Sequence, residues 1–162
     1  MPEQRLWAPW RMEYIRSDKS GECIFCAAVA SADDAAHLVV GRGEACFVML
    51  NAFPYNNGHL MVSPVRHVGD LEDLEEAESL ELMALTQRSL RALRAAYRPD
   101  GFNLGVNLGE VAGAGFAAHV HVHVVPRWAA DSNFMAVTGD ARVLPQSLED
   151  SRREVGAAFA AA

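Results

Sequence analysis

Alternating polar and apolar positions are clearest in residues 119–126, where His119, His121 and His123 are separated by valines. Successive side chains on a strand point to opposite faces, so the alternation predicts a β-strand with its imidazoles on one face and its valines in the core. Positions on one face of a strand repeat about every 6.5–7 Å. The three rings are therefore expected to form a row.

A helical period runs through residues 70–97 and predicts one long helix. Its buried stripe comprises Leu71, Leu74, Leu82, Leu85, Leu93 and Ala96. Acidic residues crowd the first half and arginines the second, an order that suits the helix macrodipole. We interpret these charges as a solvated face without a function of their own.

Shorter patterns complete the expected elements. Apolar runs predict strands near residues 45–50 and 60–63, and alternation predicts another at 102–108. A last helix is expected after residue 147, where Ser147 and Asp150 loosely fit a capping box. The expected fold class is α+β: an antiparallel sheet of about five strands, with the long helix against it and a C-terminal helix.

The 162 residues and 17.6 kDa amount to a single domain over residues 1–162. Within it we distinguish an aromatic N-terminal arm at 1–20 and a C-terminal extension at 127–162. The arm is expected to pack on its own domain or on a partner subunit, and ligand contact stays open. No apolar run approaches the ~18 residues of a membrane helix, and the start lacks the apolar core of a signal peptide. A cytoplasmic location and no membrane partner are expected.

The net charge of −7 argues against sequence-independent binding to long nucleic acid, which relies on a basic surface. It does not argue against a small anionic ligand. Backbone amides and local dipoles can hold a phosphate even where the overall charge is negative.

The three cysteines do not suggest a disulfide framework. Cys23 and Cys26 form a Cys-x-x-Cys pair, which fits a redox pair, half a zinc site or two buried thiols. A zinc site needs two further ligands, and the chain offers His67 and His119. Cys46, within an apolar strand, is more simply a buried small hydrophobe.

The row of histidines allows three interpretations: a half-exposed strand with a polar face, a metal site made from the row itself, or a nucleophilic imidazole flanked by two others. We prefer the third. A neutral imidazole is a competent nucleophile near pH 7, and its second nitrogen must then be held as a donor, for which a backbone carbonyl is the expected partner. His59 is interpreted as a hydrogen-bonded strand residue outside the site.

A glycine-rich link at residues 109–116 directly precedes the triad. Glycine allows backbone N–H groups to approach a phosphate closely, so Gly113, Ala114 and Gly115 are candidate phosphate-binding positions. A glycine-rich hairpin loop alone is a weak signal, and its position before the three histidines strengthens it.

The whole pattern resembles the histidine triad (HIT) family of nucleotide hydrolases and transferases. His-x-His-x-His followed by two apolar residues carries the resemblance, together with upstream residues 47–51 and 58–67. Residues 6–15, 126–128 and 131–134 are similar to the family's bacterial diadenosine tetraphosphate phosphorylase-like branch. The resemblance covers nearly the whole chain and implies a HIT-like fold.

The resemblance also implies roles for individual residues. His121 would attack the α-phosphorus, His123 would bind the α-phosphate, and His119 would orient its neighbours, ligate zinc or do both. Asn51 would contact the ribose, although ending a strand and capping a turn is an equally good interpretation, and Asn107 would contact the nucleotide or its phosphates. The structural zinc ligands implied are Cys23, Cys26, His67 and His119.

The implied substrate is a dinucleoside polyphosphate such as diadenosine tetraphosphate, and the implied assembly is a homodimer. Many relatives carry a Gln and a Ser or Thr where this chain has Ala114 and Gly115. This departure favours backbone donation to phosphate and puts in doubt a leaving-group role that the Gln would fill. Two alternatives remain: a phosphoramidase that releases AMP, and a slow nucleotide-binding sensor.

Overall fold

The computed structural model describes residues 22–129, 131 and 144–162. Within it, Glu22–Asp131 and Leu144–Ala162 form one compact unit. The aromatic N-terminal arm and most of the 131–134 motif lie outside the described residues, so the expectations attached to them stay predictions.

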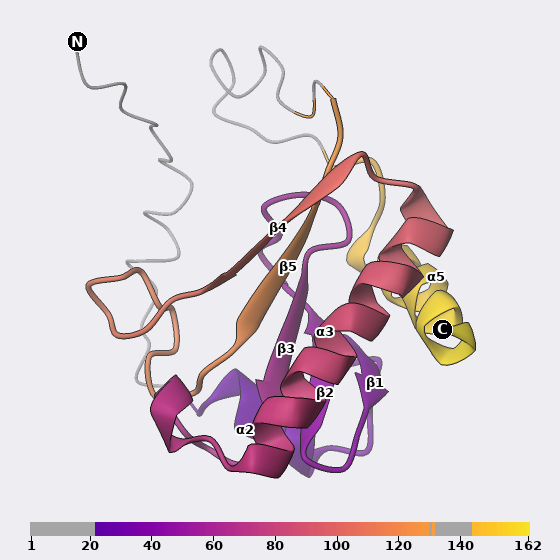
Figure 1. The fold of residues 1–162 in the computed structure, drawn as a ribbon. Coiled ribbons are helices and arrows are strands. Elements are labelled where there is room, and N and C mark those ends of the chain that lie inside the picture. The colour runs from indigo at the N-terminus through magenta and orange to yellow at the C-terminus, as the bar shows by residue number, and fades with distance from the viewer. Residues whose placement is uncertain (1–21, 130, 132–143) are drawn as a thin grey trace, which may run out of the picture. The chain divides into compact units, whose positions relative to one another are not determined.

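Five antiparallel strands form one sheet in the order β1-β2-β3-β5-β4 (Figure 1). The strands are β1 (Val39–Arg42), β2 (Cys46–Leu50), β3 (Leu60–Pro64), β4 (Gly101–Val106) and β5 (Val122–Arg127). The α+β class and the five-stranded antiparallel sheet are therefore confirmed. Because β5 lies between β3 and β4, His123 lies on an interior strand of the sheet.

The described helices are α2 (Ile24–Ala30), α3 (Glu76–Tyr97) and α5 (Leu148–Ala161), with a short 3₁₀ helix at Leu71–Asp73. The long helix ends where the sequence predicts but begins later than residue 70. Leu74 and Glu75 are extended, and the Glu78 side chain accepts the backbone N–H of Glu75 at 2.8 Å. This capping contact fixes the start of α3 at Glu76.

Both faces of β2 and β3 are buried. On one face, Val48 and Val62 pack in a cluster with residues of α3 and α5. On the other face, Phe47 and Met61 pack with Phe25 of α2. The sheet is thus covered on two sides, and the side that α2 covers is the side that carries the histidines.

The triad does not lie wholly within a strand. β5 begins at Val122, so His119 and His121 precede it. The backbone groups of Val120 are bonded outside the ladder: its N–H donates to Val68 O at 2.7 Å, and its carbonyl accepts from Ser63 Oγ at 2.9 Å. Between His119 and His121, these contacts take the place of hydrogen bonds to a neighbouring strand.

The interpretation of the charges of α3 as a solvated face is wrong for two of its acidic residues, Glu78 and Glu81. Glu78 is 6% exposed and forms an ion pair with Arg66 at 2.7 Å. The Glu81 carboxylate accepts the backbone N–H groups of Glu44 at 2.9 Å and Cys46 at 2.6 Å. Both acids therefore attach the start of α3 to the ends of β2 and β3.

The C-terminal helix begins as predicted, because Ser147 Oγ accepts the N–H of Asp150 at 3.1 Å. Near its end, Phe159 is 3% exposed and lies over Gly41 of β1, where a Cβ would come within 2.4 Å of the Phe159 ring. Among the described residues, no helix is both long and apolar enough to cross a membrane.

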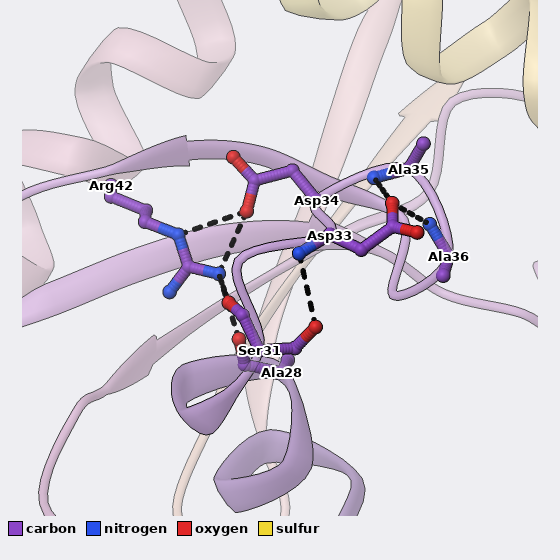
Figure 2. A network of polar contacts seen from close by, with 7 residues as sticks. All are labelled: Ala28, Ser31, Asp33, Asp34, Ala35, Ala36 and Arg42. Carbon is purple, nitrogen blue, oxygen red and sulfur yellow. Dashed lines mark hydrogen bonds and ion pairs between the residues drawn. The ribbon is translucent and has the colours of Figure 1, made fainter.

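Arg42 attaches the C-terminal end of α2 to β1 (Figure 2). Its Nη2 donates to Ala28 O at 2.7 Å and to Ser31 O at 3.1 Å, and the same guanidinium pairs with Asp34. The last carbonyls of a short helix need such partners. The bonds hold α2, and with it the Cys-x-x-Cys pair, at a fixed position beside the sheet.

Candidate active site and metal centre

The three triad histidines differ in burial, and the expected row of all three rings stays a prediction. His119 is fully buried, His121 is 5% exposed and His123 is half-buried. The rings of His121 and His123 lie 4.8 Å apart, nearly perpendicular to each other. Each buried imidazole needs partners for its nitrogens.

His121 is fixed in one tautomer by the backbone carbonyl of His119. Its Nδ1 lies 2.9 Å from the carbonyl oxygen of His119. A carbonyl can only accept, so Nδ1 carries the proton and Nε2 carries the lone pair. The backbone partner expected from the sequence is therefore present.

Burial lowers the pKa of His121, although the hydrogen bond to the His119 carbonyl opposes this shift. Removal from water disfavours the charged imidazolium. The ring is therefore neutral at neutral pH, which is the state that an imidazole needs in order to act as a nucleophile.

His119 is held in the opposite tautomer. Its Nε2 donates to the carbonyl of Pro64 at 2.9 Å, so Nδ1 carries the lone pair. Nδ1 lies 3.4 Å from Cys23 Sγ and 3.7 Å from Cys26 Sγ. Burial lowers the pKa of His119, and the Pro64 carbonyl partly offsets this effect. The nitrogen that faces the cysteines is thus able to coordinate a metal.

The structure brings together all four residues of the expected metal site, Cys23, Cys26, His67 and His119. Their candidate ligand atoms lie within 4.8 Å of one another. In a tetrahedral zinc site with ordinary bond lengths, sulfur and nitrogen ligands are about 3.5 Å apart. The spacings of His119 Nδ1 to the two sulfurs, and the 3.1 Å between Cys26 Sγ and His67 Nδ1, are close to that value. The donor set and its spacing fit zinc.

His123 is oriented by a second histidine that the sequence interpretation left outside the site. His59 Nε2 lies 3.0 Å from His123 Nδ1, and the backbone N–H of Tyr55 donates to His59 Nδ1 at 3.1 Å. Because His59 Nδ1 accepts a hydrogen bond, Nε2 must carry the proton of the neutral ring. This N–H then donates a hydrogen bond to His123 Nδ1. In its neutral form His123 then carries its own proton on Nε2.

The environment of His59 keeps this ring neutral. His59 is fully buried, and desolvation, followed by the neighbouring His123 and His121, lowers its pKa to about 3. Its supporting turn is also fixed: Asn56 Nδ2 donates to Pro126 O at 3.1 Å and to Asp131 at 2.8 Å. The correction is that His59 belongs to the triad's hydrogen-bond network.

The pairing of β3 with β5 is the signal that would have found His59. Met61 lies opposite His123 in this pair. Residues two apart on a strand share a face, and diagonal neighbours can touch. His59 therefore projects from the same face as Met61, next to His123, but only once the register of the two strands is known.

The structure gives less information on the predicted nucleotide contacts than on the histidines. Asn51 Oδ1 accepts the N–H of Phe53 at 2.8 Å, the turn role that the sequence left open, and Asn107 directly follows β4. In the glycine-rich loop, the N–H groups of Gly113 and Ala114 donate to the carbonyls of Glu110 and Gly109. Phosphate binding by Gly113, Ala114 and Gly115, and nucleotide binding by Asn51 and Asn107, stay predictions.

Comparison with known proteins agrees with this geometry. The family model for the HIT domain matches residues 33–130, which span β1 to β5. The chain belongs to the HIT family. A protein of Mycobacterium tuberculosis named AP-4-A phosphorylase is 46% identical over 159 residues, which cover 93% of this chain and 81% of that protein.

Solved structures of HIT proteins share the fold. A zinc-bound histidine triad family protein from Mycobacterium smegmatis is 31% identical, with a TM-score of 0.67 over 86% of this chain and 94% of that one. A hypothetical histidine triad nucleotide-binding protein from Sulfolobus tokodaii is 22% identical, with a TM-score of 0.68 over 86% of this chain and 93% of that one. This second likeness concerns the fold alone.

Proposed function

We propose that this chain is a nucleotidyl-transferring enzyme that cleaves dinucleoside polyphosphates, such as diadenosine tetraphosphate, through a covalent nucleotidyl-His121 intermediate. The observation that carries the proposal is the bond from His121 Nδ1 to the His119 carbonyl, because it leaves the lone pair on Nε2 of a neutral ring. The 46% identity to a protein named AP-4-A phosphorylase supports the substrate class.

The reaction has two displacements. In the first, His121 Nε2 forms a P–N bond to an α-phosphorus, the P–O bond to the distal phosphates breaks, and ATP leaves from diadenosine tetraphosphate. In the second, an oxygen of orthophosphate attacks the same phosphorus, the P–N bond breaks and ADP is released. If water attacks instead, the product is AMP. Dividing one difficult displacement into two easier ones is the general advantage of covalent catalysis.

His123 is suited to binding the α-phosphate in both steps. The relay from His59 places the proton of neutral His123 on Nε2, so this nitrogen can donate to a phosphate oxygen. Donors fixed in advance at the position where negative charge develops lower the barrier of such transfers. His119 contributes the carbonyl that orients His121 and takes no direct part in bond making.

Product analysis on diadenosine tetraphosphate tests the proposal, with and without orthophosphate. ADP plus ATP formed only with phosphate would show a phosphorylase, which the name of the mycobacterial relative favours. AMP plus ATP without phosphate would show a hydrolase. Binding without turnover in both conditions would contradict the proposal and favour the phosphoramidase or the sensor.

We propose further that Cys23, Cys26, His67 and His119 bind one structural zinc ion. Four protein ligands close a tetrahedral coordination sphere and leave no open position for chemistry. The zinc-bound relative at 31% identity supports this choice of metal. Metal analysis of protein purified without added zinc should find about one zinc per chain, because closed sites of this type bind the metal tightly.

We also propose a homodimer that works in the cytoplasm. β4 lies at one edge of the sheet, with Leu104 51% exposed, and an open strand edge is a surface on which a second copy can pair. None of the three cysteines forms a disulfide, as expected in a reducing compartment. Light scattering should give the mass of a dimer, and Leu104→Lys should shift it toward the monomer.

A further inference from the structure

Phe25 is the fully buried aromatic residue between the two cysteines of the metal cluster. Its ring centre lies 4.9 Å from that of His119 and 4.8 Å from that of His121, with interplanar angles of 38° and 33°. Aromatic rings at such distances are in direct contact. One apolar side chain therefore touches both the inner metal ligand and the proposed nucleophile.

The nucleophilic ring lies between two neighbours. Phe25 contacts His121 in a tilted arrangement, and His123 lies nearly perpendicular to it at 4.8 Å. The hydrogen bond to the His119 carbonyl fixes Nδ1, but one bond at the ring's edge still permits the ring to swing about that contact. The two ring contacts restrict this swing and so determine where Nε2 points.

Phe25 is itself held rigidly. Phe47 and Phe116 contact its ring edge-on, at 6.4 Å and 6.1 Å. Phe25 also belongs to α2, whose far end is bonded to Arg42. A support that cannot move is what a reacting atom needs, since small errors of position are costly in catalysis.

We propose that Phe25 is a positioning residue for His121, holding the nucleophilic ring in its reactive orientation from the side of the metal cluster. The inference rests on the proposed function insofar as His121 is the nucleophile. Phe25 itself takes no part in bond making.

Phe25→Leu is the informative variant, because it retains an apolar side chain but removes the flat ring surface. Phe159→Leu is its matched control: Phe159 is also a buried phenylalanine, but it belongs to the apolar cluster on the other face of the sheet, and no ring contact between Phe159 and Phe25 or a triad histidine is found among the described residues. Both variants are studied with zinc at saturating concentration, well below their melting temperatures. Steady-state rates on diadenosine tetraphosphate are combined with nitrogen NMR of the histidine rings.

We expect Phe25→Leu to lower kcat at least tenfold while KM changes less than threefold, because binding groups remain and only the reacting atom is misplaced. His121 resonances should show a mixture of ring states in this variant and one Nδ1-protonated state in the wild type. Phe159→Leu should lose similar thermal stability but keep its kcat within about threefold and its His121 resonances unchanged.

Equal effects of the two substitutions on kcat and on the His121 resonances would overturn the inference while leaving the proposed function in place. A wild-type protein that cleaves no dinucleoside polyphosphate would overturn the proposed function instead. The NMR comparison would still decide whether Phe25 fixes the His121 ring, because it needs no substrate.

Discussion

His119 and His123 stand at opposite ends of the triad, and their rings present opposite chemistry. His119 donates from Nε2 to a backbone carbonyl and presents a lone pair at Nδ1 to the cysteines. His123 accepts at Nδ1 from His59, and its neutral ring carries its proton on Nε2. One end therefore presents an electron pair toward the cysteines of the proposed metal site, and the other presents an N–H that the proposed phosphate contact would use.

The difference between the two ends lies in how firmly each tautomer is fixed. A carbonyl can only accept, so Pro64 determines the tautomer of His119 in one step. An imidazole can do either, so His59 determines the tautomer of His123 only because Tyr55 N–H occupies its other nitrogen. The tautomer of His119, at the proposed metal site, depends on a backbone carbonyl alone, whereas the tautomer of His123, at the proposed phosphate contact, depends on a buried side chain that must stay neutral.

The largest expected effect belongs to the ring between the two ends. His121→Ala should lower turnover of diadenosine tetraphosphate by about 10³-fold or more, because no other group can form the covalent intermediate. Its folded state should be retained, as judged by circular dichroism and a thermal melt. His37→Ala is the control, since His37 belongs neither to the triad nor to the metal cluster. Near-wild-type turnover by a folded His121→Ala protein would refute the mechanism.

Loss of the metal should act on stability at the His119 end. We expect Cys23→Ser to cost about 2–4 kcal/mol of unfolding free energy, or roughly 5–15 °C in Tm, because the bound metal stabilises only the folded state. Its nucleotide affinity should change much less. A chelator should lower the Tm of the wild type and of Cys46→Ala, whose thiol lies outside the cluster, but not that of Cys23→Ser. If the chelator left the wild-type Tm unchanged, the zinc proposal would be wrong.

Removing the relay should act on turnover at the His123 end. His59→Leu eliminates the donor to His123 Nδ1, so that His123 can take either tautomer, and we expect a 10- to 100-fold loss of kcat, about 1.4–2.7 kcal/mol. His59→Gln keeps an N–H near the same place and should recover most of the rate. Equal losses in the two variants would mean that His59 only fills space.

The approach of Cys23, Cys26, His67 and His119 to one another could be predicted from the sequence, whereas the contact between His59 and His123 could not. Cys23-x-x-Cys26 is a short-range pattern, and the resemblance supplied His67 and His119 as its partners. His59 lies 64 positions from His123, and their contact depends on the register of β3 against β5, which no local pattern encodes. The position of Phe25 was missed for a related reason. The sequence around an apolar residue between two cysteines does not indicate whether its side chain packs on a strand or on the ring of the proposed nucleophile.

Hydrogen bonds that the sequence pattern does not reveal explain why the predicted starts of α3 and β5 were wrong. The apolar stripe from Leu71 onward continues with helical spacing, but the capping contact between Glu75 and Glu78 begins α3 later. The His-Val alternation likewise starts at His119, although Val120 bonds to Val68 and Ser63 rather than to a neighbouring strand. Periodicity identified which residues share a face, whereas hydrogen bonds from distant segments determined where each element begins.

The smallest expected effect is the pH dependence of stability that His59 contributes. Its pKa is about 3 in the folded protein and near the ordinary 6.5 when unfolded, so between these values the unfolded state binds one more proton. The contribution to stability is complete above pH 6.5 and declines as the pH falls toward 3, by at most about 1.4 kcal/mol per pH unit.

His59→Gln removes this dependence and leaves the buried His119 and His121 in place. Urea unfolding at pH 7.5 and pH 5, at fixed zinc, should therefore show the advantage of the wild type over His59→Gln shrinking by about 1–2 kcal/mol at the lower pH. An advantage that is equal at both pH values would mean that folded His59 accepts a proton as readily as the unfolded chain does, and the relay would then not be held neutral by burial.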